Sequence, residues 1–587
     1  MADDSQTQGA VADQSPRSIS IAPLLRQGLF VFLLSCLGAL FLQVNPGFVA
    51  ADEGTSWSWN RNQGLGFGDG PYHIKAAYLY RTGEIPAAGS DFHWTRASIW
   101  NGSFSDKEFL YHIYLVPFTF LAEDELHWQA FVTGAKLSAV VAAGLFMLSM
   151  FVTLRLLNVP RAWFWLLAGG AMMGPLLAGR LTEPRSWVLG VSLAMLGWGA
   201  LSRRAWKWVF AITVLYVLTY TGSHLMLAMA LFRAAFHFAV GPAEGKRVPA
   251  LVKDLKLAGV VLAGLVVGWA LHPESIALLK VWWVQNLLVP YVHAEGTPTG
   301  LLHSLSTSLL GWAPNATMPA TPQHIMGQEL LAPELGLLIR ASTYELVAPL
   351  LLPVASLLLR VKPTRLTLAT FLIGLGFVVL HLQNGRFVEY AVPFLLISGA
   401  MWLCDMSQAR TIRSVVARFR QHRRRAMPTA VAVLLILLTV NLYRAGEMIG
   451  FRPQVHMPAV AAWMQEAPAL KGKVIYNLRW DSFPELFMYR SDCDYIWGMD
   501  PVFTSARADG QAARVVGFMT GDMRQWGSGP ADVVSALRNE FKADFLMIHD
   551  FSKSRDIYRQ VESWAAMGLL EPELLQPGEG IAIYRIP

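Results

Sequence analysis

Cysteine and charge are both scarce in this sequence. It has three cysteines in 587 residues, too few for a disulfide framework, and charged residues make up only 15% of the chain. Cys36 and Cys404 lie in apolar runs, and Cys493 has no obvious partner. No internal repeat, Walker loop, GxGxxG motif or metal-type spacing of cysteine and histidine occurs. These absences argue against a disulfide-rich scaffold, a nucleotide-binding loop and a zinc cluster.

Apolar residues, by contrast, are abundant and are grouped into blocks. They make up 54% of the chain, the mean hydropathy is +0.37, and the blocks are near twenty residues long. About 20 apolar residues cross the ~30 Å hydrocarbon core of a bilayer as a helix. The blocks lack the period-two alternation of barrel strands, so helices must satisfy the backbone in lipid. The sequence predicts a polytopic α-helical membrane protein.

Eleven apolar runs predict about eleven transmembrane helices. They are 28–48, 133–154, 162–179, 186–201, 208–222, 224–240, 257–272, 341–359, 366–383, 388–404 and 428–443. The run 109–122 is too short and too polar for a span, and we expect it to lie along the membrane interface. Residues 28–443 would then form the transmembrane module. The polar residues 1–27 predict a disordered cytoplasmic tail, followed by a retained first helix because no cleavage site follows it.

Basic clusters lie between alternate runs and indicate the orientation. They are Arg155 with Arg161; Arg203, Arg204 and Lys207; Lys246, Arg247, Lys253 and Lys256; Arg360, Lys362 and Arg365; and the segment "ARTIRSVVARFRQHRRR". If all face the cytoplasm, the N-terminus is inside and the C-terminus outside. The net charge of +7 then reflects topology, and no nucleic-acid partner is needed.

Three long segments fall on the predicted outer face. They are the loops 49–132 and 273–340 and the C-terminal segment 444–587. In the last of these, "GKVIYNL", "ADFLMIHD" and "GIAIYRI" predict strands, whereas "ADVVSALRNEF" and "YRQVESWAAMG" predict helices. We therefore expect a small extracytoplasmic α/β domain after the transmembrane module.

Polar residues gather at the predicted outer helix ends. In the first outer loop they are Asp69, His73, Asp91, His93, Asp106, Glu108 and His112; in the shorter outer turns they are Arg180, Glu183 and Arg185, then Tyr220 and His224, then Arg386, Glu389 and Tyr390. Ionisable groups at membrane depth cost roughly 2.5–3.5 kcal/mol each on insertion scales, which favours a functional role. Their joint placement predicts a site at the boundary between membrane and water.

Structural roles for single residues stay open at this stage. Asp69 precedes Pro71 and could cap a helix that begins there. Glu183 could form an ion pair with a neighbouring arginine, and Arg386 could pair with Glu389 three residues later. His73 and His112 could be interfacial side chains with no chemistry. The functional interpretation rests on the set and not on any one of these residues.

The first outer loop resembles that of a known family. "GDGPYHIKAAYLYRTGEIP" (68–86) and "GSDFHWTR" (89–96) resemble the first extracytoplasmic loop of the GT-C glycosyltransferases, above all the catalytic subunit of oligosaccharyltransferase. "NGRFVEYAVP" (384–393) is similar to a late GT-C segment in which an Arg and a Tyr precede a span with proline. The C-terminal segment also looks like the appended domain of bacterial relatives. The "WWD" motif with which oligosaccharyltransferases read the acceptor sequon is reduced to "RWD" at 479–481, and the "DE" pair of protein mannosyltransferases is absent.

The resemblance implies an inverting transferase. Its donor would be a sugar on a polyprenyl phosphate or pyrophosphate, and its acceptor a lipid, polysaccharide or protein at the outer face of the plasma (inner) membrane. An acceptor hydroxyl needs a base, for which Asp69 is the candidate. The anionic leaving group needs cations, first Arg386. The further candidates for donor-phosphate binding are Tyr390, Arg180, Arg185, His73 and His224. A divalent cation such as Mg²⁺ or Mn²⁺ would be held by Asp69, Asp91, Asp106 and Glu183.

Two other functions remain as alternatives. One is a different polyprenyl-linked glycan enzyme, a ligase or polymerase. The other is a non-enzymatic transporter of lipids or glycans. A transporter should carry broken helices or charges midway through its spans, often in two related halves. The charges here lie at outer helix ends and no halves repeat, which favours surface chemistry.

Overall fold

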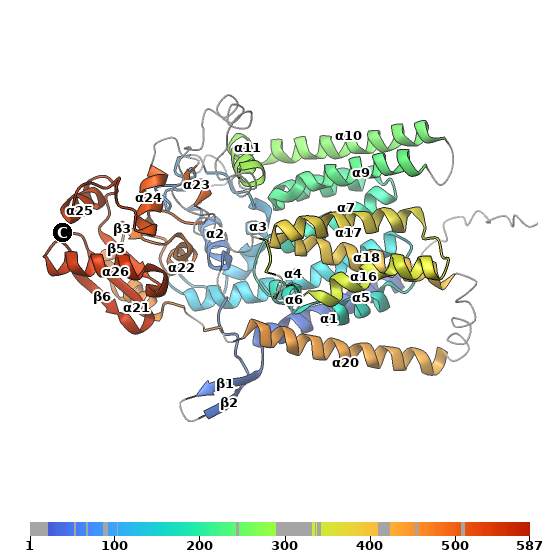
Figure 1. Cartoon of the computed structure of the whole chain (residues 1–587), viewed down its shortest axis with the longest axis horizontal. Coiled ribbons are helices and arrows are strands. Elements are labelled where there is room, and N and C mark those ends of the chain that lie inside the picture. Colours follow the sequence, from blue (N-terminus) through green and yellow to red (C-terminus); the bar gives the residue numbers. More distant parts are fainter. Residues whose placement is uncertain are drawn as a thin grey trace, which may run out of the picture.

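A helical bundle with a small sheet domain at one end makes up the chain (Figure 1). The computed structural model describes residues 21–587 except 52–53, 66–67, 86–91, 103, 242–245, 289–331, 335, 337, 339–341, 409–422, 451, 454–455, 500 and 506–510. Most of the predicted tail 1–27 and of the predicted loop 273–340 lies outside the described residues.

Twelve described helices form the bundle. They are α1 (Ile21–Val44), α4 (Trp128–Leu156), α5 (Ala162–Met172), α6 (Pro175–Arg180), α7 (Trp187–Ser202), α8 (Trp206–Thr219), α9 (Leu225–Val240), α10 (Arg247–Leu271), α16 (Thr343–Leu358), α17 (Arg365–Gln383), α18 (Val388–Ser407) and α20 (Arg423–Ile449). Between α8 and α9 lies the turn η1 (Thr221–His224), and between α17 and α18 the turn η4 (Gly385–Phe387).

Six segments of the described chain are long and apolar enough to cross a membrane. They are Ala22–Val44, Trp128–Leu156, Thr221–Val240, Arg365–Gln383, Gly385–Ser407 and Arg425–Ile449. The multi-pass helical architecture is confirmed, whereas the count of about eleven spans is not. One reason is visible at the predicted run 162–179, where α5 ends and α6 begins at Pro175, which lacks the N–H that a continuous helix needs.

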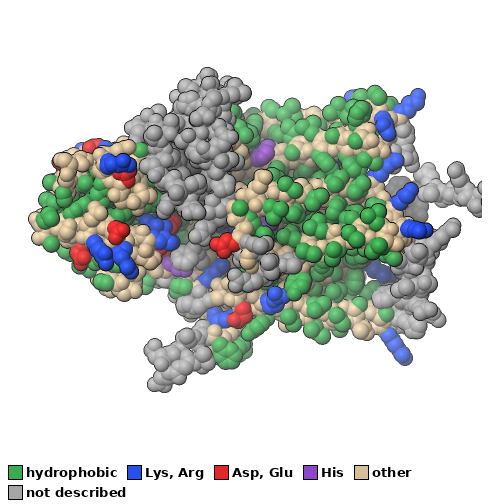
Figure 2. Space-filling view, viewed as in Figure 1, with side chains coloured by type: hydrophobic (Ala, Val, Ile, Leu, Met, Phe, Trp, Pro, Cys, Tyr) green, Lys and Arg blue, Asp and Glu red, His purple; other side chains and the backbone are tan. Residues whose placement is uncertain are grey.

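Lys and Arg side chains gather at the end of the bundle that lies away from the sheet domain, and the flanks between are largely hydrophobic (Figure 2). This is the distribution expected of helices that cross a bilayer with their basic loops on one side.

Glycines allow close approach of two of the helices. Gly264 and Gly268 lie one turn apart on α10 and face α8. A methyl group built on Gly264 would lie 2.8 Å from Cβ of Thr213, and one on Gly268 would lie 2.7 Å from Cβ of Val217. Small residues four apart let two helices pack closely in lipid. Such close packing is needed there because no hydrophobic effect drives the helices together.

The first long loop forms a cap over one end of the bundle. It contains the antiparallel hairpin β1 (Gly47–Ala51) and β2 (Gly54–Ser58), and the helices α2 (Gly70–Thr82) and α3 (Phe109–Thr119). The helix α11 (Ser275–Trp283) and the π-helical turn η2 (Val284–Leu288) follow α10 on the same side (Figure 1). At 11 residues, α3 is about 16 Å long and too short to cross a bilayer, in keeping with the interfacial prediction for 109–122.

The C-terminal domain is built on a five-stranded sheet in the order β4-β3-β5-β7-β6. Its strands are β3 (Val474–Asn477), β4 (Asp494–Tyr495), β5 (Phe545–His549), β6 (Glu571–Gln576) and β7 (Ile581–Arg585); its helices are α21 (Pro458–Glu466), α22 (Phe483–Tyr489), α23 (Val502–Ser505), α24 (Gln511–Thr520), α25 (Pro530–Asn539) and α26 (Phe551–Ala566), with short turns η5 (Pro468–Leu470), η6 (Trp480–Ser482) and η7 (Pro577–Glu579). Strand β3 runs parallel to β4 and β5, whereas β7 is antiparallel to β5 and β6. The three predicted strands are β3, β5 and β7, and the two predicted helices are α25 and α26.

The first loop pairs with the edge of this sheet through its backbone. Thr95 forms a parallel bridge with Tyr495, and the Tyr495 N–H donates to the carbonyl of Trp94 at 2.9 Å. The N–H of Ala97 donates to the carbonyl of Ile496 at 2.7 Å. The loop therefore acts as an added strand beside β4, and one hydrophobic core runs from α2 into the sheet domain.

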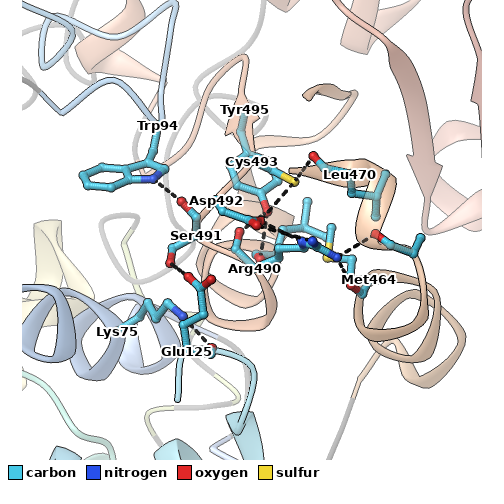
Figure 3. Close-up of polar contacts among 12 residues, drawn as sticks. Lys75, Trp94, Glu125, Met464, Leu470, Arg490, Ser491, Asp492, Cys493 and Tyr495 are labelled. Carbon is cyan, nitrogen blue, oxygen red and sulfur yellow. Dashed lines mark hydrogen bonds and ion pairs between the residues drawn. The ribbon is translucent and has the colours of Figure 1, made fainter. Parts of the chain in front are cut away.

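Side chains reinforce the same junction (Figure 3). The indole N–H of Trp94 donates to the carbonyl of Ser491 at 2.5 Å, and the Ser491 hydroxyl donates to Glu125 at 3.1 Å. The ammonium group of the buried Lys75, on α2, donates to the carbonyl of Glu125 at 2.7 Å. The sheet domain is thus held to α2, the helix that directly follows Asp69.

Replacing Asp494 with alanine should weaken this junction. Its carboxylate accepts hydrogen bonds from Arg96 at 2.7 and 2.9 Å and lies 2.8 Å from Nδ1 of His93. Burial would raise the pKa of Asp494, but these hydrogen bonds lower it below its ordinary value. We expect a loss of about 2 kcal/mol in unfolding free energy, measured by thermal melting in detergent. Asp522→Ala, which removes a pair with the exposed Arg524 and a hydrogen bond from the backbone N–H of Arg524, is the control and should change little. Equal melting shifts for both variants would contradict this role.

Candidate functional site

A polar pocket lies where the bundle, the first loop and the sheet domain meet. Its walls come from the start of α2, the segment before α3, the α6–α7 turn, the turns η1 and η4, and the loop after β4. The residues that line it are Asp69, His73, Lys107, Glu108, Arg185, Ser186, Trp187, Tyr220, Arg386 and Met499. Asp69, Arg185 and Arg386, which are far apart in sequence, share this pocket.

Asp69 is placed by the local sequence at the N-terminus of α2. Pro71 favours the first turn of a helix, and the backbone carbonyl of Asp69 accepts from the N–H of His73 at 3.0 Å. The Asp69 side chain, however, makes no capping hydrogen bond to α2. It is 30% exposed, and one oxygen lies 3.9 Å from Nη2 of Arg185. Because its carboxylate does not cap the helix, the capping interpretation does not account for this residue.

The arginines of the two outer turns have different surroundings. Arg185 contacts Asp69 and also lies 3.5 Å from Glu183 through its Nε. Arg386 sits on η4, where the side chain of Asn384 accepts from its backbone N–H at 3.0 Å. Arg180 instead forms an ion pair with the fully buried Glu389, with Nε 2.9 Å from the carboxylate. It is not among the described residues that line the pocket.

A buried histidine–carboxylate group forms one wall. Nδ1 of His112 lies 2.6 Å from Oδ2 of Asp106, and its Nε2 lies 2.9 Å from Nδ1 of His73. An ionised carboxylate can only accept, so His112 must donate to Asp106 from Nδ1. The two imidazoles and the carboxylate therefore form one chain of contacts that runs from Asp106 through His112 to His73. Glu108 accepts from the Ser186 hydroxyl at 2.8 Å, and its other oxygen is 3.8 Å from His73.

The charge state of this group follows from its burial. Burial lowers the pKa of His73 to about 4, so the imidazole is neutral at pH 7. Burial alone would raise the pKa of Asp106, but the positive charge and hydrogen bond of His112 lower it below its ordinary value. For Glu108, burial is likewise outweighed by Lys107 and the two histidines. The group therefore presents imidazole nitrogen and ionised carboxylate oxygen.

This donor set fits a divalent cation. One ligand atom each from His73, Glu108 and His112 lies within 4.8 Å of the others, and all three residues are buried. Oε2 of Glu108 is buried without a hydrogen-bond partner among the described residues, which is costly unless something occupies it. The carboxylate of Asp106 on His112 is the outer support that metal-bound histidines usually have. Two imidazoles and a carboxylate suit Zn²⁺ or Mn²⁺ better than Mg²⁺, which takes oxygen ligands.

The remaining sequence-predicted ligands and binding residues lie elsewhere. Asp91 is outside the described residues, and Glu183 pairs with Arg185 beside the pocket. The hydroxyl of the buried Tyr390 is 2.7 Å from that of Tyr216. His224 lies 3.3 Å from the indole nitrogen of Trp282. Among the described residues, neither Tyr390 nor His224 lines the pocket.

The "RWD" segment lies at the carboxyl ends of the parallel strands β3 and β5. Asp481 accepts from Arg479 at 2.6 and 3.1 Å and is 3.7 Å from Nε2 of His549. Asp550 pairs with Lys553 at 3.0 Å on the neighbouring strand end. The carboxylate of Asp481 is therefore already engaged by side chains of its own domain.

Acid should destabilise the protein through His73. Its pKa of about 4 in the folded chain lies below the ordinary 6.5, so the unfolded chain binds the proton more readily. Stability is then highest above pH 6.5 and falls as the pH drops toward 4, by roughly 3 kcal/mol at 1.36 kcal/mol per pKa unit. His73→Asn should show a shallower fall in melting temperature between pH 7 and 4.5. His549, whose pKa is also about 4, is present in both proteins and cancels. Parallel pH profiles would contradict this assignment.

Comparison with known proteins supports the GT-C expectation at the level of fold. No protein-family model matches the chain, and no curated protein matches it. Solved structures of the oligosaccharyltransferase AglB of Archaeoglobus fulgidus do match, at 11–12% identity over 93–95% of this chain and 73–74% of that chain. The TM-score is 0.57 for the apo form, 0.56 for the form tethered to an acceptor peptide with an NVT sequon, 0.55 for the complex with an inhibitory peptide and a dolichol-phosphate, and 0.51 for the complex with Zn and sulfate. The chain has the fold of a GT-C oligosaccharyltransferase.

Proposed function

We propose that the protein is an inverting glycosyltransferase that uses a polyprenyl-phosphate or pyrophosphate donor. The observation that carries the proposal is the shared pocket of Asp69, Arg185 and Arg386 at the membrane end of a GT-C fold. A carboxylate and two guanidinium groups are the complement needed for an acceptor proton and an anionic leaving group.

In the proposed reaction, Asp69 removes the proton from the acceptor as the acceptor attacks the anomeric carbon. The bond between that carbon and the phosphate oxygen breaks, and the electron pair leaves with the phosphate. Arg386 and Arg185 stabilise the charge that develops there. A single displacement of this kind inverts the anomeric carbon.

A divalent cation would be held by His73, Glu108 and His112. When bound, it would supply positive charge beside the leaving phosphate, as Lewis-acid metals do in phosphoryl sites. Asp106 and Ser186 orient His112 and Glu108, and Asp69 faces the same pocket.

The acceptor we propose is a peptide. The matching fold belongs to a protein whose structures include an acceptor peptide and a dolichol-phosphate. Lipid and polysaccharide acceptors are the alternatives, and the engaged Asp481 gives no reason to assume the same sequon. The clustering of Lys and Arg at the far end of the bundle supports a plasma-membrane orientation with residues 1–27 in the cytoplasm and the domain 444–587 outside.

The direct test uses purified full-length protein in lipid nanodiscs. Polyprenyl-phosphate and polyprenyl-pyrophosphate sugars are offered with a panel of peptides, lipids and glycans, and products are identified by mass spectrometry. Release of lipid phosphate together with a glycosylated acceptor supports the proposal. Donor binding with no turnover on any acceptor would favour the transporter alternative.

The cation should be detectable without activity. After treatment with a chelator, Zn²⁺ or Mn²⁺ is expected to raise the melting temperature of the wild-type protein by several degrees, because it binds only the folded site. Glu108→Gln should abolish the rise, since it removes the carboxylate charge. Glu123→Gln, an exposed carboxylate in the same loop, is the matched control. An equal rise in wild type and Glu108→Gln would rule out this ligand set.

A further inference from the structure

A second cavity lies apart from the candidate site, between the ends of α1 and α4 that face the sheet domain. It is open to solvent, and the two pockets share no lining residue. Its described lining comprises Leu40, Gln43 and Val44 of α1, Val132, Thr133, Lys136, Leu137 and Val140 of α4, and Asn60 and Gln63 of the segment after β2.

The cavity is divided into an apolar and a polar half. Leu40, Leu137 and Val140 line it along the membrane helices, and Leu40 and Leu137 are each 43% exposed. Asn60 and Gln63 line it from the loop beyond the helix ends. The apolar half matches the acyl chains of a lipid, and the half with hydrogen-bonding groups matches its headgroup.

Lys136 is the charged group of the cavity. It is half-buried on a membrane helix, and its ammonium group donates to the backbone carbonyl of Asn62. None of the described residues that line the cavity carries a carboxylate, and no described acid forms an ion pair with Lys136. A carbonyl takes one of its three N–H groups but does not neutralise its charge. An uncompensated cation at membrane depth calls for an anion.

The adjoining hairpin marks the depth of the cavity. Strands β1 and β2 follow the end of α1 directly and project beside the end of α20 (Figure 1). Phe48, Trp57 and Trp59 are 61, 47 and 74% exposed, and Phe48 and Trp59 each contact Trp57 edge to face. Exposed aromatic residues of this kind favour the boundary between membrane and water. The segment that follows β2 is held to the helix ends by Arg61, which donates to Asn45 and pairs with Glu447 at 2.7 Å.

We propose that this cavity binds an anionic phospholipid of the leaflet on the sheet-domain side. Lys136 contacts the phosphodiester, Asn60 and Gln63 hydrogen-bond the headgroup, and the acyl chains lie along Leu40 and Leu137. The bound lipid is a structural ligand at the α1–α4 seam and is separate from the donor in the pocket of Asp69.

The test measures lipid binding to the purified full-length protein in neutral detergent. Phosphatidylglycerol is titrated against phosphatidylcholine, and bound lipid is counted by native mass spectrometry with thermal melting in parallel. We expect phosphatidylglycerol to bind and stabilise more strongly, and Lys136→Gln to weaken its binding about fivefold, the effect of one lysine beside an anionic headgroup. Lys207→Gln, which removes a lysine on α8, is the matched control and should bind as wild type does.

Further measurements distinguish binding of the whole lipid in this cavity from binding of the headgroup alone or binding in the other pocket. Glycerol phosphate, which has the headgroup chemistry without acyl chains, should not stabilise the protein, since the apolar half contributes to binding. Arg386→Ala should leave phosphatidylglycerol binding intact, because that residue belongs to the other pocket. Thr133→Trp, a change at the exposed rim of the cavity, should block the lipid if Lys136→Gln fails to fold. Equal binding of the two lipids, or undiminished binding by Lys136→Gln or by Thr133→Trp, would overturn the proposal.

Discussion

Asp69→Asn is expected to abolish glycosyl transfer and leave the fold intact. The amide has the size of the carboxylate but cannot take up a proton, so kcat should fall about 10³-fold, within the range for loss of a general base. The helix α2 does not depend on the Asp69 side chain, since that side chain makes no capping bond. The measurement is turnover in nanodiscs at saturating donor, with the melting temperature recorded on the same preparation.

Glu183→Gln is the matched control for this change. Glu183 also lies near Arg185, at 3.5 Å, but is not among the described residues that line the pocket. Its loss should alter turnover far less than the loss of Asp69. Near-normal turnover by Asp69→Asn would exclude Asp69 as the base. Equal losses in both variants would show that only the net charge around Arg185 matters.

The sequence predicts the helical bundle but not the positions at which its helices are interrupted. Runs of apolar residues are read reliably because burial in lipid demands them at every position of a span. The division of 162–179 into α5 and α6 depends on one residue, Pro175, and hydropathy does not register it. Runs such as 186–201 and 208–222 become helices of 16 and 14 residues, below the usual span length.

Strand prediction succeeded where strands are buried. The predicted strands β3, β5 and β7 are apolar and lie at the centre of the sheet. The edge strand β6 is mostly exposed, and β4 is only two residues long, so neither leaves a hydrophobic pattern. The aromatic residues Phe48 and Trp57 of the hairpin β1–β2 are likewise exposed, so the hairpin does not show the alternation of a strand with one buried face.

The candidate site was predictable in outline for a geometric reason. Asp69, Arg185 and Arg386 lie in turns at the same end of the bundle, so topology alone brings them to one side. The partners of Arg180 and Tyr390 depend on side-chain packing between helices, which a single sequence does not contain.

Glu108 and His112 were seen in the sequence but not assigned as ligands. Their spacing of four residues at a helix start places both side chains on one face and was the available signal. The approach of His73 to within 2.9 Å of His112 arises only from the packing of α2 against α3.

Arg386→Ala should act on the donor and not on the chemistry of the acceptor. Removing a guanidinium that contacts an anionic phosphate forfeits about 2 kcal/mol, which corresponds to a roughly 30-fold rise in the donor KM with a smaller fall in kcat. Arg386→Lys should recover part of the affinity, because it restores the charge without the planar fork.

Arg180→Ala serves as the comparison, since Arg180 lies in a neighbouring turn but pairs with the buried Glu389. Its loss removes an ion-pair partner of a buried carboxylate, so we expect lower thermal stability with little change in donor KM. Initial rates over a range of donor concentrations, taken with melting curves, separate the two cases. If Arg386→Ala lowers turnover at unaltered donor affinity, the phosphate contact is wrong, and Arg185, 3.9 Å from Asp69, becomes the residue that must hold the leaving group.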